Sequence, residues 1–475
     1  MTRIEIYLKL ITYNLFFGLW RFRTYLSKYL KKTQNSQKLM QISIIGAGYV
    51  GLVSAGCFAK LGDEVICADI NEQKINQITQ GNVPIYEPGL EELIKEGIEK
   101  ERLKFTSDIS EAIKHGDVIF TCVGTPSNSD GSADISAVLS VAEHFADIKR
   151  SISKYKVLVL KSTVPPGTAR TCYKIIKSKN VKAFGIVSNP EFLKEGSAIQ
   201  DFMKPDRIIV GSPSKKARKK VIEAYHGVLR IYVPIIETEN WETAELIKYA
   251  NNAFLATKIS FINEMANIAE QFNADIETIA AAIGLDYRIN PRFLHPGVGF
   301  GGSCLPKDLR AIIKRAEQRG YQASFLREVL ETNERQKKHI VEKIKQVYGS
   351  LQGKVFAILG LSFKPKTDDM REAPSIIIIN ELLALGARIK AYDPKAIPNA
   401  KKIFKNKIEY CSSIDKAITG SNGIIIVTEW DEFRDIDYSK FVDKVADRRI
   451  FDGRNIYDPK QIKRQGFKYY GIGRA

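Results

Sequence analysis

The sequence has few cysteines, and no two of them have CxxC spacing. The six are scattered over 475 positions, at Cys57, Cys67, Cys122, Cys172, Cys304 and Cys411. This pattern argues against a zinc site and a disulfide framework, and it favours a reducing compartment such as the cytoplasm. We therefore expect no metal, and each thiol is free to take part in chemistry.

Long apolar runs are also missing. The uninterrupted run at residues 15–20 is far shorter than the roughly 20 residues of a membrane-spanning helix. Glu5, Lys9 and Thr12 fall on one helical face, and Lys and Arg residues follow without a small-residue cleavage site. We interpret residues 1–39 as a basic amphipathic extension in peripheral contact with the inner face of the membrane. The alternatives are a mis-assigned start codon or a helix that packs on protein.

The net charge of +18 would ordinarily suggest a nucleic-acid partner. Residues 1–39 supply +7 of it, from eight Lys or Arg against Glu5, and the rest is spread over the chain in modest clusters such as 215–220. Such clusters are usually solvated faces, so we predict no nucleic-acid binding. A basic interior would also suit an anionic small substrate or cofactor.

At this length the chain should form two or three domains. A buried strand at 42–45 leads into Gly46-Ala47-Gly48-Tyr49-Val50-Gly51 and an apolar helix, and a second strand ends at Asp69. In this strand–turn–helix–strand context GxGxxG is the dinucleotide fingerprint, in which the acid bonds the adenosine ribose. Asp69 would repel a 2′-phosphate and so favours NAD over NADP, although Lys74 lies nearby.

Further strands of the same sheet are predicted at 118–123, 157–160, 186–188 and 208–211, the last closing the domain. Thr125 and Thr163 follow the first two, at the strand ends where open α/β sheets bind ligands, although hydroxyls there also cap helices. After the third strand, a helical turn would place Glu191 and Glu195 on one face.

A helical pattern covers residues 240–272, longer than a typical globular helix. Such a helix usually connects domains or forms a dimer seam. Lys248 and Asn252 stand four residues apart on one face, which is either solvated or functional.

A glycine-rich loop at 299–308 presents Cys304 near Lys307 and Asp308. This is how a cysteine nucleophile is built, but it is also compatible with a half-buried free thiol.

A second βαβ pattern begins at 355, but its turn has no GxGxxG and carries Lys364 instead. It should therefore not bind NAD in the same way, and Lys364 offers a cation to a phosphate. The fold class is thus α/β, with two Rossmann-like doubly wound domains joined by a long central helix and a small helical domain. We expect boundaries at 1–39, 40–236, 237–330 and 331–475.

From residue 41 to 475 the chain resembles the nucleotide-sugar 6-dehydrogenases, the UDP-glucose/GDP-mannose dehydrogenase family. Lys248 and Asn252 belong to the resemblance, and the other motifs are GAGYVG at 46–51, PIYEPGL at 84–90, VGTP at 123–126, DGSAD at 130–134, STVP at 162–165, NPEFL at 189–193, GGSC at 301–304, FKP at 363–365 and FDGR at 451–454. Residues 1–39 lie outside it.

The resemblance implies two successive NAD-dependent oxidations at C6 of a nucleotide sugar, through a thiohemiacetal and a thioester on Cys304. The residues at 84–90 and 130–134 favour UDP-glucose over GDP-mannose or a UDP-N-acetylhexosamine. A non-catalytic NAD/UDP-sugar-binding protein held at a membrane is the alternative from another class. A homodimer is expected.

The implied residue roles fall into three sets. The catalytic set is Cys304, Lys248, Asn252, Asp308, Glu191 and Thr163. The set in contact with NAD is Gly46, Gly48, Tyr49, Val50, Gly51, Asp69, Lys74, Thr125, Thr163, Glu195, Lys307 and Arg371. The set in contact with the UDP-sugar is Glu191, Phe192, Leu193, Lys248, Asn252, Arg288, Phe293, Leu294, His295, Pro296, Gly297, Gly301, Lys364 and Arg454, of which Arg288 matches an arginine that reaches across the dimer.

Overall fold

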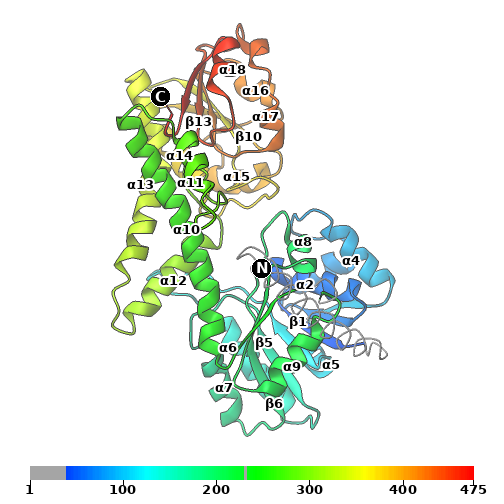
Figure 1. Cartoon of the computed structure of the whole chain (residues 1–475). Coiled ribbons are helices and arrows are strands. Elements are labelled where there is room, and N and C mark those ends of the chain that lie inside the picture. The colour runs from blue at the N-terminus through cyan, green and yellow to red at the C-terminus, as the bar shows by residue number, and fades with distance from the viewer. Residues whose placement is uncertain (1–38, 229–232, 475) are drawn as a thin grey trace, which may run out of the picture.

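Two lobes joined by a long helix make up the described part of the protein (Figure 1). The computed structural model describes residues 39–228 and 233–474. The interpretation of residues 1–39 as an amphipathic extension thus falls almost entirely outside the described residues. Within the described ranges, no helix combines the length and apolar character needed to cross a bilayer.

The first lobe contains an eight-stranded sheet in the order β3-β2-β1-β4-β5-β6-β7-β8. Its strands are β1 Gln41–Ile45, β2 Glu64–Ala68, β3 Leu103–Thr106, β4 Val118–Thr121, β5 Lys156–Leu160, β6 Phe184–Ser188, β7 Ile208–Gly211 and β8 Ile235–Thr238. The first six strands are parallel, and β7 is antiparallel to β6. The chain changes direction across the sheet between β1 and β4, which is where doubly wound sheets bind nucleotides.

Helices cover both faces of this sheet. They are α2 Tyr49–Lys60, α3 Glu72–Thr79, α4 Leu90–Glu99, α5 Ile109–His115, α6 Ser136–Lys149, α7 Thr168–Ser178, α8 Ala198–Met203 and α9 Lys215–Ala224. Apolar residues of α2, α4 and α9 form one core with the sheet, and those of α5, α6 and α7 form another. A strand buried on both faces reads as a continuous apolar run, which is why β1 and β5 could be predicted.

The expectation that the strand at 208–211 closes the first domain is wrong, because β8 pairs with β7 in parallel beyond it. Strand β3 was not predicted from the sequence either. Both missed strands lie at the edges of the sheet, and their residues are only partly buried. Edge strands lack the continuous apolar run that marks a central one, so they give a weak signal.

The second lobe has a six-stranded parallel sheet in the order β11-β10-β9-β12-β13-β14. Its elements are β9 Val355–Leu359, α14 Pro374–Ala384, β10 Arg388–Tyr392, α15 Ile397–Phe404, β11 Glu409–Tyr410, α16 Ile414–Ile418, β12 Gly423–Ile426, α17 Asp431–Arg434, η2 Tyr438–Phe441, β13 Arg449–Asp452, α18 Pro459–Arg464 and β14 Lys468–Gly471. It repeats the strand order of the first six strands of the other lobe, so the prediction of a second Rossmann-like unit is confirmed.

The helix α10, Trp241–Gln271, begins in the first lobe and reaches the second (Figure 1). The side chain of Asn240 caps its first turn by accepting a hydrogen bond from Thr243 N. Its 31 residues give a length of about 46 Å. The chain continues through α11 Ile276–Gly284, α12 Leu305–Glu317 and α13 Ser324–Tyr348, and both α12 and α13 pack along α10.

Contacts tie α10 to both lobes. Near its start, the buried Glu245 carboxylate accepts from Gly167 N at 2.7 Å and Ala169 N at 2.8 Å, at the beginning of α7. Further along, Asn263 accepts from Gly297 N at 2.8 Å. The helix therefore holds the loop before α7 and the loop before α12 in fixed positions relative to each other.

Candidate active site at the junction of the two lobes

Two glycines of the fingerprint, Gly46 and Gly51, have a steric role in the turn between β1 and α2. Gly46 has φ +106°, and a Cβ added there would lie 2.8 Å from Cys122 O. A Cβ on Gly51 would lie 1.8 Å from Gly46 O, whereas Gly48 faces open space. The turn is therefore closed on its protein side and open at the start of α2, where the backbone N–H groups can face a pyrophosphate. Val50 stands in the first turn of that helix.

Asp69 lies directly after β2, beside this turn. Its carboxylate accepts from Ala47 N at 2.8 Å and Asn71 N at 3.0 Å, and it pairs with Lys74 Nζ at 2.8 Å. Partial burial alone would raise the pKa of Asp69, but Lys74 and the two N–H groups outweigh burial and lower it. An ionised acceptor at this position suits ribose hydroxyls and disfavours a 2′-phosphate.

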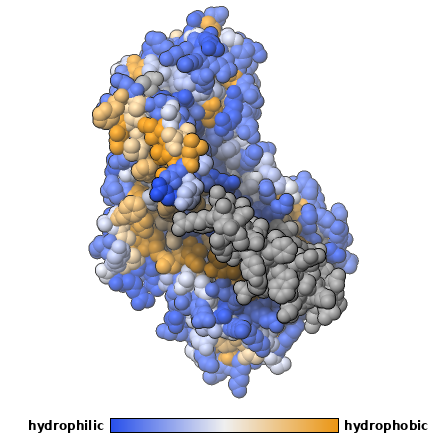
Figure 2. Space-filling model, viewed as in Figure 1, coloured by the Kyte–Doolittle hydropathy of each residue, from blue (hydrophilic) through white to orange (hydrophobic). Residues whose placement is uncertain are grey.

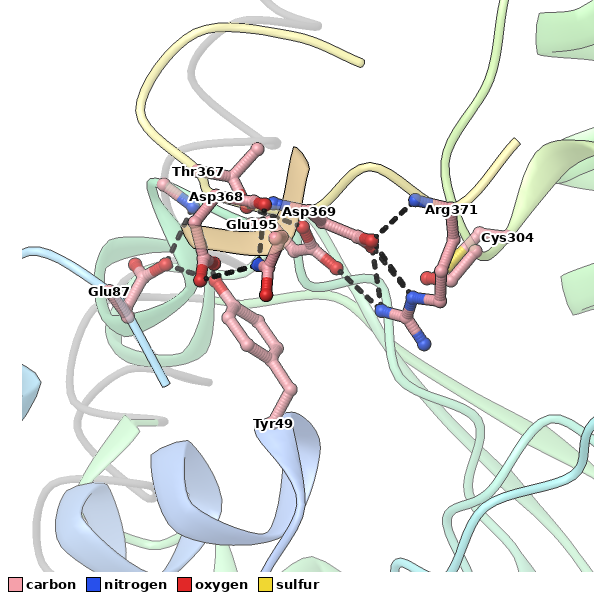
Figure 3. Close-up of polar contacts among 11 residues, drawn as sticks. Tyr49, Glu87, Glu195, Cys304, Thr367, Asp368, Asp369 and Arg371 are labelled. Atoms are coloured by element: carbon pink, nitrogen blue, oxygen red, sulfur yellow. Dashed lines mark hydrogen bonds and ion pairs between the residues drawn. The ribbon is translucent and has the colours of Figure 1, made fainter. Parts of the chain in front are cut away.

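The Tyr49 side chain points from the start of α2 towards Glu87 and the loop that carries Glu195 (Figure 3). Its hydroxyl donates to Glu87, and Gly196 N donates to both the hydroxyl, at 3.1 Å, and Glu87, at 2.6 Å. Ala198 N adds a third hydrogen bond to Glu87 at 2.7 Å. The PIYEPGL segment thus anchors the loop that carries Glu195.

Thr125 and Thr163 come together, as their positions after neighbouring strands predict. Thr125 Oγ1 donates to Thr163 O at 2.9 Å, joining the ends of β4 and β5. Thr125 is buried and Thr163 is half-buried. Both therefore lie at the carboxyl edge of the sheet, on the side of the fingerprint turn.

Cys304 occupies the N-cap position of α12, and Asp308 lies one turn further on. Asp308 N donates to Cys304 O at 2.8 Å, and Pro306 in the first turn fixes where the helix begins. The Asp308 side chain is buried and pairs with Lys307 Nζ at 2.5 Å. The suggestion that Lys307 contacts a cofactor stays a prediction, because in this structure its partner is Asp308.

Among the six cysteines, Cys304 alone is exposed. Neighbouring groups nevertheless surround its sulfur, so desolvation, followed by the carboxylates of Asp308 and Glu191, raises the pKa of the Cys304 thiol, while Lys248 lowers it. Burial raises the pKa of the Cys57 and Cys172 thiols to about 12. Cys304 is the accessible thiol that has a cation beside it.

Lys248 and Asn252 project from one face of α10 towards Cys304, and both are 5% exposed. This excludes the alternative of a solvated face. Lys248 Nζ lies 3.2 Å from Glu191 Oε1, and Asn252 Nδ2 donates to Asp308 Oδ2 at 2.7 Å. Burial alone would lower the pKa of Lys248, but the carboxylates around it raise it above its usual value, so the ammonium form is favoured.

The expectation that Glu191 and Glu195 share one helical face is wrong. Residues 189–196 form a loop without a helix, and hydrogen bonds from Gly196 N and Ala198 N to Glu87 hold the end of that loop in place. Glu191 caps Leu193 N and faces Lys248, whereas Glu195 faces the other lobe. The two carboxylates therefore serve different parts of the site.

Glu195 forms the contact between the lobes. Thr367 Oγ1 donates to it at 2.9 Å, and Arg371 lies 3.6 Å away (Figure 3). Burial and the Asp369 carboxylate raise the pKa of Glu195 to about 7. Arg371 in turn pairs with Asp369 at 2.6 Å. A Cβ on the adjacent Gly196 would meet Lys366 O at 3.0 Å, so the two backbones touch here.

On the side of the second lobe, the loop before α12 packs directly on that lobe. A Cβ on Gly297 would lie 2.8 Å from Gly453 O, and one on Gly301 would lie 2.3 Å from Glu372 O. Arg454 reaches across, with its guanidinium 3.4 Å from both Gly299 O and Phe363 O.

The remaining predicted substrate residues surround that contact. Leu294 and Pro296 are buried, Phe293 is half-buried with φ +67°, and His295 is exposed. Lys364 is half-buried, and desolvation lowers its pKa. Phe192 and Leu193 line a cavity of about 230 Å³ that Arg207 and Arg292 also line.

Arg288 is not brought into this site. Its side chain is 74% exposed and pairs with Asp286 of its own turn at 2.6 Å. Its expected reach into a neighbouring subunit stays a prediction.

Several side chains that shape the site were not predicted from the sequence. Thr367 and Asp369 complete the contact around Glu195, and Glu245 ties α10 to the loop that carries Thr163. The position of Glu245, three residues before Lys248 on the same helical face, was an available signal. The positions of Thr367 and Asp369 gave no such signal. Thr367, for example, is 172 residues away from its partner Glu195. In the described ranges, no three His, Cys, Asp or Glu side chains gather as a metal site would require.

A dinucleotide turn in one lobe, a nucleotide-type sheet in the other and an accessible thiol with buried Lys and Asn side chains between them define a class of protein. It is the class of NAD-dependent dehydrogenases that act on a second, nucleotide-bearing ligand. Three sequence models of one family match the chain: the UDP-glucose/GDP-mannose dehydrogenase NAD-binding domain at residues 40–229, the central domain at 242–335 and the UDP-binding domain at 357–459. The chain belongs to the UDP-glucose/GDP-mannose dehydrogenase family.

Individual relatives agree with this assignment. The chain is 45% identical to UDP-glucose 6-dehydrogenase TuaD of Bacillus subtilis, over 92% of this chain and 94% of that one. It is 42% identical to a UDP-glucose 6-dehydrogenase of Pseudomonas aeruginosa, over 92% and 98%. Among solved structures, a UDP-glucose dehydrogenase from Pyrobaculum islandicum superposes with a TM-score of 0.86 at 35% identity, covering 93% of this chain and 99% of that one. A UDP-D-ManNAc dehydrogenase from Pyrococcus horikoshii superposes with a TM-score of 0.80 at 27% identity, covering 92% and 99%.

Proposed function

We propose that this protein oxidises UDP-glucose twice at C6, to UDP-glucuronate, with NAD⁺ as the oxidant. The observation that carries the proposal is the convergence of Cys304, Lys248, Asn252 and Asp308 between the NAD fingerprint and the second nucleotide-type sheet. The identities of 45% and 42% to proteins named UDP-glucose 6-dehydrogenases favour UDP-glucose over sister nucleotide sugars.

The chemistry explains why a thiol is required. NAD⁺, when bound, accepts the hydride in each of the two oxidations. In the first, the C6 hydroxyl also gives up its proton, leaving an aldehyde, which has no carbinol from which a second hydride can leave. Cys304 Sγ adds to the aldehyde carbon and forms a thiohemiacetal, whose oxidation gives a thioester. Water then hydrolyses the thioester, releasing the carboxylate and regenerating the thiol.

The side chains around Cys304 fit distinct roles in these steps. Lys248, as an ammonium, and Asn252, through its amide N–H, stabilise the oxyanion that develops on the C6 oxygen, and one such donor contributes about 3 kcal/mol in comparable sites. Glu191 and Asp308 move protons through water, since both carboxylates lie beside these two side chains. Thr163 lies at the carboxyl ends of the central strands, where it orients the reacting groups.

The ligand contacts divide between the lobes. The residues that contact NAD in the fingerprint segment and after β2 are Gly46, Gly48, Tyr49, Val50, Gly51 and Asp69. The rest of the NAD site is formed by Lys74, Thr125, Thr163, Glu195, Lys307 and Arg371. The UDP-sugar is held by Glu191, Phe192 and Leu193, by residues 293–297 and Gly301, and by Lys364 and Arg454. We assign these functions to ranges 40–236 for NAD, 237–330 for the catalytic helices and 331–475 for UDP.

The dimer is part of the proposal. One face of α10 and the residue that caps its end leave a row of apolar side chains exposed, which we call the α10 stripe: Leu246, Phe254, Phe261, Ile268 and the C-cap Phe272. Figure 2 shows apolar residues gathered over the side of the molecule where α10 lies. A stripe of this length that no other described residue covers is typical of a self-association surface. We also propose that the protein is cytoplasmic and that residues 1–39 give it peripheral contact with a membrane.

Turnover with separate nucleotide sugars tests the function. Purified protein with UDP-glucose should form two NADH per UDP-glucose consumed, and much less with GDP-mannose or a UDP-N-acetylhexosamine. Robust NADH formation with another sugar and none with UDP-glucose would overturn the choice of substrate. Cys304→Ser should abolish the double oxidation while Cys57→Ser, which removes a buried thiol in α2, retains it. Full turnover by the Cys304→Ser protein would refute the covalent step.

A further inference from the structure

A line of hydrogen bonds runs from the wall of the cavity to the side chains beside Cys304. Arg207 Nη2 donates to Asn251 Oδ1 at 2.7 Å, Asn251 Nδ2 donates to Asn252 Oδ1 at 3.1 Å, and Asn252 Nδ2 donates to Asp308 Oδ2 at 2.7 Å. Arg207 is half-buried, and its guanidinium lies 3.7 Å from the centre of the Phe192 ring. Neither Arg207 nor Asn251 belongs to the motifs that define the site.

The two ends of this line fix its direction. A guanidinium can only donate hydrogen bonds, and an ionised carboxylate can only accept them. The Asn251 oxygen must therefore face Arg207, which turns its NH₂ group to Asn252. The Asn252 oxygen must then face Asn251, which turns its NH₂ group to Asp308. Reversing either amide would set two acceptors or two donors against each other.

We propose that Arg207 and Asn251 are positioning residues that hold the Asn252 amide with its NH₂ group towards the reacting C6 oxygen. The inference rests on the proposed function for the role of Asn252, and it adds the two side chains that determine which end of that amide faces the substrate. One N–H of Asn252 is used by Asp308, and the other is left to donate to the oxyanion.

Two substitutions at position 251 separate orientation from packing. Asn251→Asp keeps the size of the side chain and can still accept from Arg207, but it cannot donate to Asn252, so its carboxylate competes with Asp308 for the single NH₂ group. Asn251→Leu keeps the branch at Cγ and the number of side-chain heavy atoms, and it leaves Asp308 without a competitor. If orientation matters, Asp is the more harmful replacement. If residue 251 only fills space, the nearly isosteric Asp is no worse than Leu.

The expected kinetic result is a fall in kcat with little change in binding. Asn251→Asp should lower kcat about tenfold or more, by misplacing one oxyanion donor. Asn251→Leu also removes the hydrogen bond from Arg207, but the Asn252 amide itself loses one neutral hydrogen bond, so kcat should fall about threefold at most. KM for UDP-glucose should stay within about twofold in both, as expected when an interaction made in the transition state is lost. In an Asn252→Ala background, Asn251→Asp should have little further effect, because there is no amide left to orient.

A second measurement needs no substrate. The rate of Cys304 alkylation by iodoacetamide, followed against pH, reports the pKa of that thiol, since the other five cysteines are buried. Asn251→Asp should shift the profile to higher pH, and by more in the wild-type background than in Asn252→Ala, where only the added charge acts. Asn267→Leu, the same amide loss further along α10, should leave the profile unchanged.

These measurements keep the two ideas apart. A wild-type protein that does not reduce NAD⁺ with UDP-glucose refutes the proposed function, while the alkylation profiles still report on the amide. Equal kcat losses for Asn251→Asp and Asn251→Leu, or a profile shift of the same size with and without Asn252, would overturn the positioning role.

Discussion

The α10 stripe gives a quantitative prediction about assembly. Phe254 is 65% exposed and Phe261 is 50% exposed, although both are large apolar side chains. An aromatic side chain has 150–250 Å² of surface, so burying the exposed part of Phe254 removes about 100 Å² from water. At about 25 cal/mol per Å², this contributes roughly 2.5 kcal/mol per copy, and Phe254→Ala removes about 2 kcal/mol of it because the Ala methyl stays buried.

In a twofold-symmetric dimer each substitution is present twice. Phe254→Ala should therefore weaken the dimer by about 4 kcal/mol, which corresponds to a roughly thousandfold higher dissociation constant. Analytical ultracentrifugation across a range of concentrations measures this constant directly. Ile403→Ala, which removes an exposed apolar side chain in α15 outside the stripe, is the matched control and should leave it unchanged.

Two results would refute this reasoning. One is a wild-type protein that stays monomeric at high micromolar concentration, and the other is a Phe254→Ala dissociation constant equal to that of Ile403→Ala. If Arg288 serves the neighbouring subunit, the weakened dimer should also show a higher KM for UDP-glucose at low protein concentration. An unchanged KM in fully monomeric protein would remove that role from Arg288.

Three other predictions concern stability, cofactor binding and the extension. Partial burial would raise the pKa of Glu270, but His339 and Lys343 outweigh it and the pKa falls to about 2. The stability from Glu270 is thus present above its unfolded pKa near 4.5 and is lost as pH falls towards 2. Glu270→Gln should cost about 2 kcal/mol in urea unfolding at pH 7, and the difference from wild type should shrink below about pH 5. Gly51→Ala should abolish NAD binding in calorimetry, because its methyl would lie 1.8 Å from a backbone oxygen. Deletion of residues 1–38 should leave turnover intact and reduce co-sedimentation with anionic liposomes.

Each of these has a contradicting result. A Glu270→Gln deficit that is the same at pH 7 and pH 3 would show that packing, not charge, is responsible. Normal NAD affinity in Gly51→Ala would contradict the steric role of that glycine. Unchanged liposome binding after the deletion would exclude residues 1–38 as the membrane contact.

Those elements and turns that depend on a local pattern of residues could be predicted from the sequence. The strand before Gly46, the fingerprint turn and α10 follow from buried runs, glycine spacing and an uninterrupted helical period, and the structure has all three. Lys248 and Asn252 could be placed on one face by their spacing, although spacing alone could not show that this face is buried.

What could not be predicted depends on contacts between distant segments. The Glu195 carboxylate finds Thr367 from the other lobe, and Arg207 finds Asn251 on α10. Such pairs leave no periodic signal, since each is a single contact between segments that are far apart in the sequence. The error over Glu191 and Glu195 has the same origin, because tertiary hydrogen bonds to Glu87 override the helical spacing of the two acids.

The attachment of α10 to both lobes has a consequence for protein engineering. Glu245 binds the helix to the turn before α7, and Asn263 binds it to the loop that leads to Cys304. A chimera that exchanges the nucleotide preference of the second lobe would break one of these attachments if it were spliced near residue 240. A junction after α13, at the exposed turn around Gly349, would transplant β9–β14 as a unit and leave α10 with both of its native partners.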